Sequence, residues 1–205
     1  MPSDHYVTLA APVEFRQKIE RSEFLSLGFP VTSEEEFFAI LHGVEKRHFD
    51  ATHHCWAFRL FGDGEVRQRS SDAGEPSGTA GKPILSAIEG ADLFDIAIVV
   101  VRWYGGVKLG TGGLGRAYRD TAAQALSDAP RLDRYVYEQI RVTVPFAALN
   151  VVYRLIDAPH VVLRHEEFGD TNEFTFDVRS SRIDLFVHTL TEKRLAYVRR
   201  QESEP

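Results

Sequence analysis

Several residue types that would define particular classes of protein are scarce or missing in this chain. Its 205 residues include one cysteine, Cys55, which excludes an internal disulfide framework and a cysteine-rich zinc site. No apolar run is long enough to span a bilayer, and residues 1–12 lack the basic start and apolar core of an export signal. We therefore expect a cytoplasmic protein that has no membrane association and needs no cofactor.

A strongly positive charge is also missing. The net charge of −6 argues against a protein that coats nucleic acid by bulk attraction, because such domains are usually strongly basic. The distribution of charge differs from the total, since the segment from Arg102 to Arg119 contains four basic residues and no acidic one. A local basic patch on an acidic protein is therefore compatible with the sequence.

Hydrophobic patterning predicts an α+β protein of two domains. Residues 134–205 read as strand, helix, strand, strand, helix and strand, the order of a ferredoxin-like domain. Ile140, Val142 and Val144 alternate with polar residues, as in a strand buried on one face. A proline-containing stretch at 128–133 marks the boundary, so residues 1–130 form the first domain.

The first domain shows its own sequence of elements. A capping box at 32–36 begins a helix, and Gly62-Asp-Gly64 between two strand-like runs indicates a hairpin. The continuous apolar run 96–101 predicts a strand buried on both faces, and 113–128 predicts a helix. These patterns indicate layered packing of helices on a sheet.

Two glycine-rich loops, 72–82 and 102–116, precede predicted helices. Glycine lets backbone amides approach a ligand closely, and a helix N-terminus carries partial positive charge, so both loops suit a phosphate. In the first loop we expect Asp72 and Glu75 to order the chain by accepting its amides. The expected phosphate or nucleic-acid contacts are Ser77, Gly78, Thr79, Lys82, Arg102, Tyr104, Lys108, Gly110, Thr111, Gly112, Gly113 and Arg116.

Neither loop matches a known nucleotide motif. A Walker loop needs a glycine five residues before Gly81 and a hydroxyl residue after Lys82, but Pro76 and Pro83 occupy those positions. The G-x-G-x-x-G of Gly110, Gly112 and Gly115 begins well after the predicted strand, and no second parallel strand with a ribose-binding acid follows. The loops therefore predict neither a nucleoside triphosphatase nor a dinucleotide-binding enzyme.

Three long motifs resemble the bacterial YigZ-like branch of the IMPACT family. They are Asp50-Ala-Thr-His-His-Cys-Trp-Ala57, the stretch 71–85 containing Gly-Glu-Pro-Ser-Gly-Thr-Ala-Gly-Lys-Pro, and the stretch 102–118 beginning Arg-Trp-Tyr-Gly-Gly. The resemblance implies a first domain like the second domain of the fifth small-subunit ribosomal protein, a fold that elongation factor G also uses in its fourth domain. It implies a second domain like the last domain of elongation factor G. Because a eukaryotic member regulates translation, the resemblance implies partners among RNA, the ribosome or translation proteins.

Our main interpretation is a non-enzymatic nucleic-acid- or ribosome-binding factor that regulates translation, with Trp103 and Tyr104 stacking on unpaired bases. In the simpler alternative, Trp103 and Tyr104 pack the domain and the glycines only form turns. Two further alternatives are a metal-dependent phosphoester hydrolase using Asp72 and Glu75, and a protein-interaction adaptor. We expect no catalytic residue and no metal ligand, with Cys55 as a small core residue. The sequence leaves the oligomeric state open.

Overall fold

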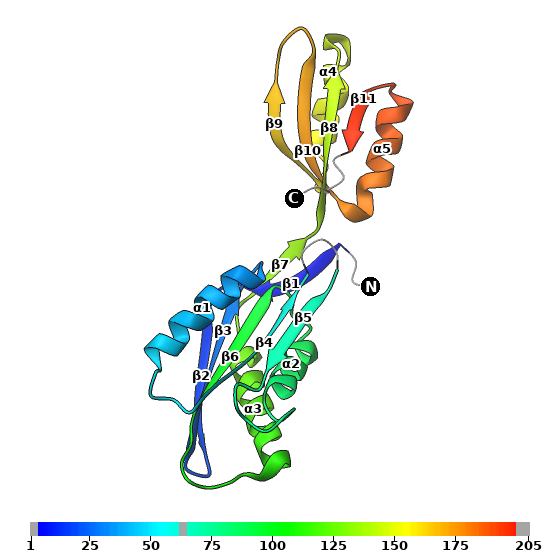
Figure 1. Ribbon diagram of the computed structural model, residues 1–205. Helices are drawn as coiled ribbons and strands as arrows, with labels where there is room; N and C mark the ends of the chain where they lie inside the picture. Colours follow the sequence, from blue (N-terminus) through cyan, green and yellow to red (C-terminus); the bar gives the residue numbers. More distant parts are fainter. Residues whose placement is uncertain (1–3, 62–64, 200–205) are drawn as a thin grey trace. The chain divides into compact units, whose positions relative to one another are not determined.

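The computed structural model describes residues 4–61 and 65–199, and its contacts divide the chain into two compact units. The first unit is Tyr6–Arg134, and the second contains residues 135–199 together with residues 4–5. Figure 1 shows helices and strands in both units. In the described residues, no helix combines the length and the apolarity that crossing a membrane requires.

The first unit is built on a five-stranded antiparallel sheet in the order β2-β3-β6-β4-β5. The strands are β2 (Val13–Ile19), β3 (Ser22–Pro30), β4 (His53–Leu60), β5 (Arg67–Ser71) and β6 (Ile96–Trp103). The helices are α1 (Glu34–Arg47), α2 (Gly81–Gly90) and α3 (Gly110–Ser127). A separate two-stranded sheet pairs β1 (His5–Leu9) with β7 (Arg131–Tyr135).

Helices cover both faces of this sheet, which explains the unbroken apolar run in β6. Ile96, Ile98 and Val100 pack in the cluster that includes α2 and α3, whereas Val99 and Val101 pack in the cluster that includes α1. Successive side chains of a strand point to opposite faces, so a strand buried on both faces must be apolar throughout. The prediction of a doubly buried strand at 96–101 is confirmed.

The helix α1 begins with the predicted capping box. The Ser33 hydroxyl accepts a hydrogen bond from the Glu36 amide at 3.2 Å, and the Glu36 carboxylate accepts one from the Thr32 amide at 2.8 Å. These contacts satisfy amides that have no partner inside the helix. The strands β4 and β5 pair as the hairpin signal predicts, but the turn itself, 62–64, lies outside the described residues.

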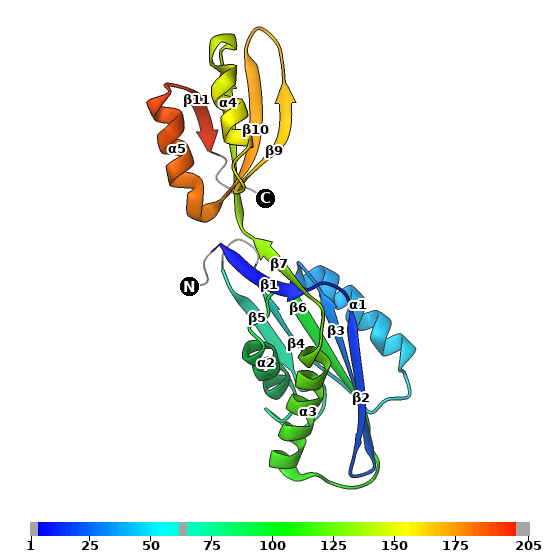
Figure 2. The same ribbon diagram turned by 180° about the vertical axis from the view of Figure 1, so that it is seen from behind.

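Both glycine loops lie at one end of the five-stranded sheet, visible in Figures 1 and 2 around the turn that joins β2 to β3. The strand β6 ends there, and its antiparallel neighbours β3 and β4 begin there. The helices α2 and α3 start from this end, and α1 finishes at it. We call this region the loop end and define it by residues 20–21, 48–52, 72–80 and 104–113.

The second unit has a four-stranded antiparallel sheet in the order β11-β8-β10-β9. Its elements are β8 (Tyr137–Val144), η1 (Phe146–Ala148), α4 (Leu149–Ile156), β9 (Val161–Glu167), β10 (Asn172–Arg179), η2 (Ser180–Arg182), α5 (Ile183–Glu192) and β11 (Ala196–Arg199). This connectivity is the ferredoxin-like split β-α-β. Its core contains Ile140, Val142, Phe174 and Phe176 from the strands and Phe186 from α5.

Candidate functional site

The first glycine loop is organised around Asp72, just after β5. Its carboxylate accepts hydrogen bonds from the amides of Gly78 at 2.7 Å, Ala80 at 2.9 Å and Gly81 at 2.8 Å. Burial pushes the pKa of Asp72 upward, but the three amides and the nearby Lys82 outweigh it and hold the pKa below its usual value. The N-terminus of α2 therefore already has an anion, supplied by the protein itself.

The expected phosphate contacts of this first loop are only partly available. Thr79 is buried, and its hydroxyl donates to the Pro76 carbonyl at 2.6 Å. The side chains of Ser77 and Lys82 are exposed. Because Asp72 occupies the amides of Gly78 and Gly81, the loop presents two exposed side chains and no cradle of free amides.

Glu75 and Arg102 form a buried ion pair, which differs from both roles predicted for them. Arg102 is 4% exposed and donates through Nη1 to Glu75 Oε1 at 2.6 Å and through Nη2 to Ser22 Oγ at 3.2 Å. Glu75 also accepts a hydrogen bond from the Tyr118 hydroxyl at 2.7 Å, not from loop amides. Arg102 faces inward because it shares a strand face with Ile98 and Val100, so it drops out of the phosphate-binding surface.

A buried thiol completes this polar cluster. Cys55 Sγ lies 2.9 Å from the Asp72 carbonyl and 3.4 Å from the Tyr118 hydroxyl. Burial raises the pKa of Cys55 to about 12, and chiefly burial, with Cys55 and Glu75 adding to it, raises that of Tyr118. A thiol with so high a pKa is protonated at neutral pH and is a poor nucleophile. Cys55, Glu75, Arg102 and Tyr118 form one buried polar cluster. It joins the two glycine loops, because Glu75 of the first loop pairs with Arg102 of the second.

The second loop leaves β6 through two aromatic residues that are fixed by the turn before β4. The Trp103 indole donates to Asp50 Oδ2 at 3.0 Å, and the Tyr104 amide donates to Thr52 Oγ1 at 3.0 Å. Trp103 is half-buried, whereas the Tyr104 side chain is 44% exposed. Tyr104 therefore has both a fixed backbone and a ring that solvent can reach.

The N-terminus of α3 has no carboxylate of its own. Among the described residues, the N-cap residue Leu109 supplies no side-chain hydrogen bond to it, and its first turn contains no acidic residue. Gly110, Thr111 and Gly112 are exposed and Gly113 is half-buried, with Lys108 just before them and exposed. Arg116 lies beside this turn, because a Cβ placed on Gly112 would be 4.0 Å from Arg116 Nη1. The two helices thus differ: α2 is capped by Asp72, and α3 presents amides flanked by two cations.

The second loop also packs tightly against the β2–β3 turn. A Cβ on Gly105 would collide with the Arg21 carbonyl oxygen, a backbone atom whose displacement shifts the chain itself. We expect Gly105→Ala to lower the free energy of unfolding by about 1–3 kcal/mol, the usual cost of overpacking. Gly43→Ala is the control, because space at that position in α1 is open, and it should stabilise by about 0.5–1 kcal/mol. Equal effects of the two substitutions in urea unfolding would contradict the close contact.

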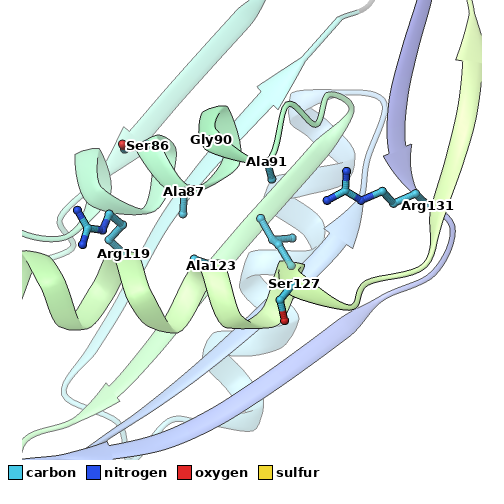
Figure 3. A pocket seen from close by; sticks show the side chains of 9 residues that line it. Ser86, Ala87, Gly90, Ala91, Arg119, Ala123, Ser127 and Arg131 are labelled. Carbon is cyan, nitrogen blue, oxygen red and sulfur yellow. The ribbon is translucent and has the colours of Figure 1, made fainter.

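A shallow groove of about 360 Å³ lies between the later parts of α2 and α3 (Figure 3). Figure 3 shows Arg119 and Arg131 at opposite ends of it, with Ala87 and Ala123 between them. The groove adjoins the C-terminal ends of both helices, which carry partial negative charge. The helix dipoles there oppose an anion, whereas at the α3 N-terminus they favour one.

Within residues 4–61 and 65–199, no group of three or more His, Cys, Asp or Glu side chains is arranged to hold a metal ion. The two carboxylates considered for a hydrolase are both engaged, Asp72 by amides and Glu75 by Arg102 and Tyr118.

Comparison with solved structures supports the two-unit α+β architecture. A crystal structure described as that of a hypothetical protein has a TM-score of 0.70 and 27% identity with this chain. It covers 97% of this chain, and this chain covers 98% of it. The chain is therefore a mixed helix-and-sheet protein, and its likeness to the solved structure includes residues of both units.

Sequence comparison gives the family. An IMPACT family member from Haemophilus influenzae is 33% identical over 189 residues, 92% of each chain. YigZ, an IMPACT family member from Escherichia coli, is 42% identical over 118 residues, 57% of this chain and 58% of that protein. The profile of the Impact N-terminal domain matches residues 20–126. The chain belongs to the IMPACT family.

Proposed function

We propose that this protein is a non-enzymatic RNA-binding or ribosome-binding factor that acts in the regulation of translation. The observation that carries the proposal is the N-terminus of α3, where the exposed residues Gly110 to Gly112 lie along the chain between Lys108 and Arg116. A phosphate of a nucleic-acid backbone is the anion that suits such a site.

The contrast between α2 and α3 strengthens the proposal. Both helices begin in glycine-rich chain at the same end of the sheet, but only α2 receives a carboxylate from its own protein. The first amides of a helix have no partner inside the helix and need an acceptor from elsewhere. At α3 solvent can meet that need, and an anion meets it better because the helix dipole and two cations add to the hydrogen bonds.

The net charge of the protein limits how strongly it can bind RNA. A net charge of −6 repels nucleic acid at long range, so attraction must come from the local cations. Few phosphate contacts imply a modest affinity that depends weakly on salt. For single strands, the logarithm of the binding constant falls by about 0.7 per neutralised phosphate for each tenfold rise in salt concentration. Tyr104, exposed on the same loop, adds a ring on which a base can stack.

Membership of the IMPACT family supports the translational part of the proposal. The proposal includes a resemblance of each unit to domains of the translation machinery. The first unit would have the fold shared by the fifth small-subunit ribosomal protein and elongation factor G, and the second unit that of the last domain of elongation factor G. A phosphate-binding loop end suits a protein of that kind acting at the ribosome.

The test reverses the two cations of the α3 site. We expect Lys108→Glu with Arg116→Glu to weaken binding of a fluorescent single-stranded RNA by at least about tenfold at low salt, because two attractive contacts become repulsive. The matched control is Arg119→Glu with Arg131→Glu, the same charge change at the α2–α3 groove. Equal binding by wild type and the first variant would refute the site, and selective loss in the control would move it to the groove.

A further inference from the structure

An aromatic side chain is displayed in solvent at the loop end, outside the residues already assigned to the phosphate site. Phe49, in the turn between α1 and β4, is 84% exposed, the highest value among the exposed large hydrophobic residues. Single exposed apolar residues are common and need no explanation by themselves. Phe49 differs from such residues because its turn is held by hydrogen bonds and is linked to the segment that carries Tyr104.

The turn that carries Phe49 is held on both sides. The Ala51 amide donates to the His48 carbonyl at 3.0 Å, closing a four-residue turn with Phe49 in its second position. Asp50 accepts the Trp103 indole hydrogen bond, and the Thr52 amide donates to the Arg102 carbonyl at 2.8 Å. The exposed ring therefore projects from a fixed backbone, which lowers the entropy cost of using it in a contact.

The same contacts bring Phe49 into the neighbourhood of Tyr104. Thr52, three residues after Phe49, accepts the Tyr104 amide hydrogen bond, so both exposed rings belong to segments joined by hydrogen bonds. Exposed basic residues occur on the segments that carry or adjoin these rings: Lys46 and Arg47 in the last turn of α1, Arg21 whose backbone contacts Gly105, and Lys108 on the second loop. Aromatic rings among cations are the combination that single-stranded nucleic acid requires.

We propose that Phe49 and Tyr104 form a stacking surface for unpaired bases, which makes the loop end selective for single-stranded over double-stranded nucleic acid. The inference rests on the proposed function, since the α3 N-terminus holds the backbone phosphate of the same strand. Bases in a duplex are stacked on one another and hide their faces, so a ring on this surface gains contact area only with an unpaired base.

The experiment compares wild type with Phe49→Ala, using a 12-nucleotide RNA that contains 2-aminopurine and the duplex of the same sequence. Wild type is expected to quench the 2-aminopurine fluorescence on binding. Phe49→Ala should reduce that quenching and weaken single-strand binding about 5- to 150-fold, while leaving duplex binding unchanged. Phe146→Ala is the control, because Phe146 is a 70% exposed phenylalanine of the second unit.

The outcomes separate this inference from the proposed function. Single-strand binding that is unchanged in Phe49→Ala, or wild-type preference for the duplex, would overturn the stacking surface while leaving the phosphate site intact. Failure of wild type to bind either RNA would overturn both. Since Phe49 is exposed, the variant should unfold at the wild-type temperature, and the binding comparison then reports on contact with the ligand.

Discussion

Replacing Glu75 by alanine is expected to lower the free energy of unfolding by about 3–5 kcal/mol, the usual cost of breaking a buried ion pair by removing one partner. Glu75 and Arg102 are both nearly inaccessible, with side-chain exposures of 4% and 5% and an N–O separation of 2.6 Å. Among the described contacts, loss of Glu75 leaves the Arg102 guanidinium with Ser22 as its remaining hydrogen-bond partner and removes the acceptor of the Tyr118 hydroxyl. The unpaired, buried Arg102 charge then accounts for most of the lost stability.

Urea unfolding followed by circular dichroism measures this change. Glu89→Ala is a suitable control, because Glu89 is exposed and, among the described contacts, its side chain hydrogen-bonds to Gln68 alone. Its effect should stay within about 0.5 kcal/mol. The double variant Glu75→Leu with Arg102→Met should recover part of the stability, since it leaves no unpaired charge. A Glu75→Ala variant whose free energy of unfolding lies within about 0.5 kcal/mol of wild type, the scale of an ordinary surface change, would contradict the buried pair.

The second large effect concerns Asp72. Asp72→Ala removes the acceptor of three amides, and we expect it to destabilise the protein by about 2–3 kcal/mol, more than the loss of a single helix cap. Hydrogen exchange should speed up at Gly78, Ala80 and Gly81, the residues whose amides Asp72 accepts. Unchanged protection of these three amides in the variant would show that Asp72 does not order the loop.

The pH dependence of the Asp72 contribution follows from the lowered pKa of its carboxyl in the folded protein. A group whose folded pKa lies below its unfolded pKa stabilises the protein above the unfolded value, and that stabilisation disappears as the pH falls through the folded value. The stability gap between wild type and Asp72→Asn should therefore be constant above about pH 5 and narrow as the pH falls below about 4, the ordinary Asp pKa, and through the lower folded value. A gap independent of pH would indicate that the carboxylate is not preferentially stabilised in the folded state.

Much of the fold could be predicted because its patterns are local. The run 96–101 is apolar throughout and becomes a doubly buried strand, and Ser33 with Glu36 begins α1. The start of α3 was harder to predict, since the helix begins at Gly110 and not at Gly113. Glycine is a poor helix former, so the first turn depends on tertiary packing that single-residue propensity does not describe.

The site could be predicted only in outline. The loops were recognisable from glycine and charge, but the inward direction of Arg102 depends on counting two residues at a time from Ile96, a signal present in the sequence. Its partner Glu75 lies 27 residues away and meets it only through the fold. The exposure of Phe49 is likewise a property of the folded turn, because an aromatic residue after a helix is equally compatible with burial.

The most direct measurement is the change in backbone amide NMR signals when a short single-stranded RNA is added to the full chain. Binding at the α3 N-terminus should shift the signals of Gly110, Thr111, Gly112 and Gly113, whose helix end has no internal cap. The signals of Gly78 and Gly81 should change little, because Asp72 already accepts their hydrogen bonds. Shifts confined to the first loop or to the α2–α3 groove would contradict a nucleic-acid site at the start of α3.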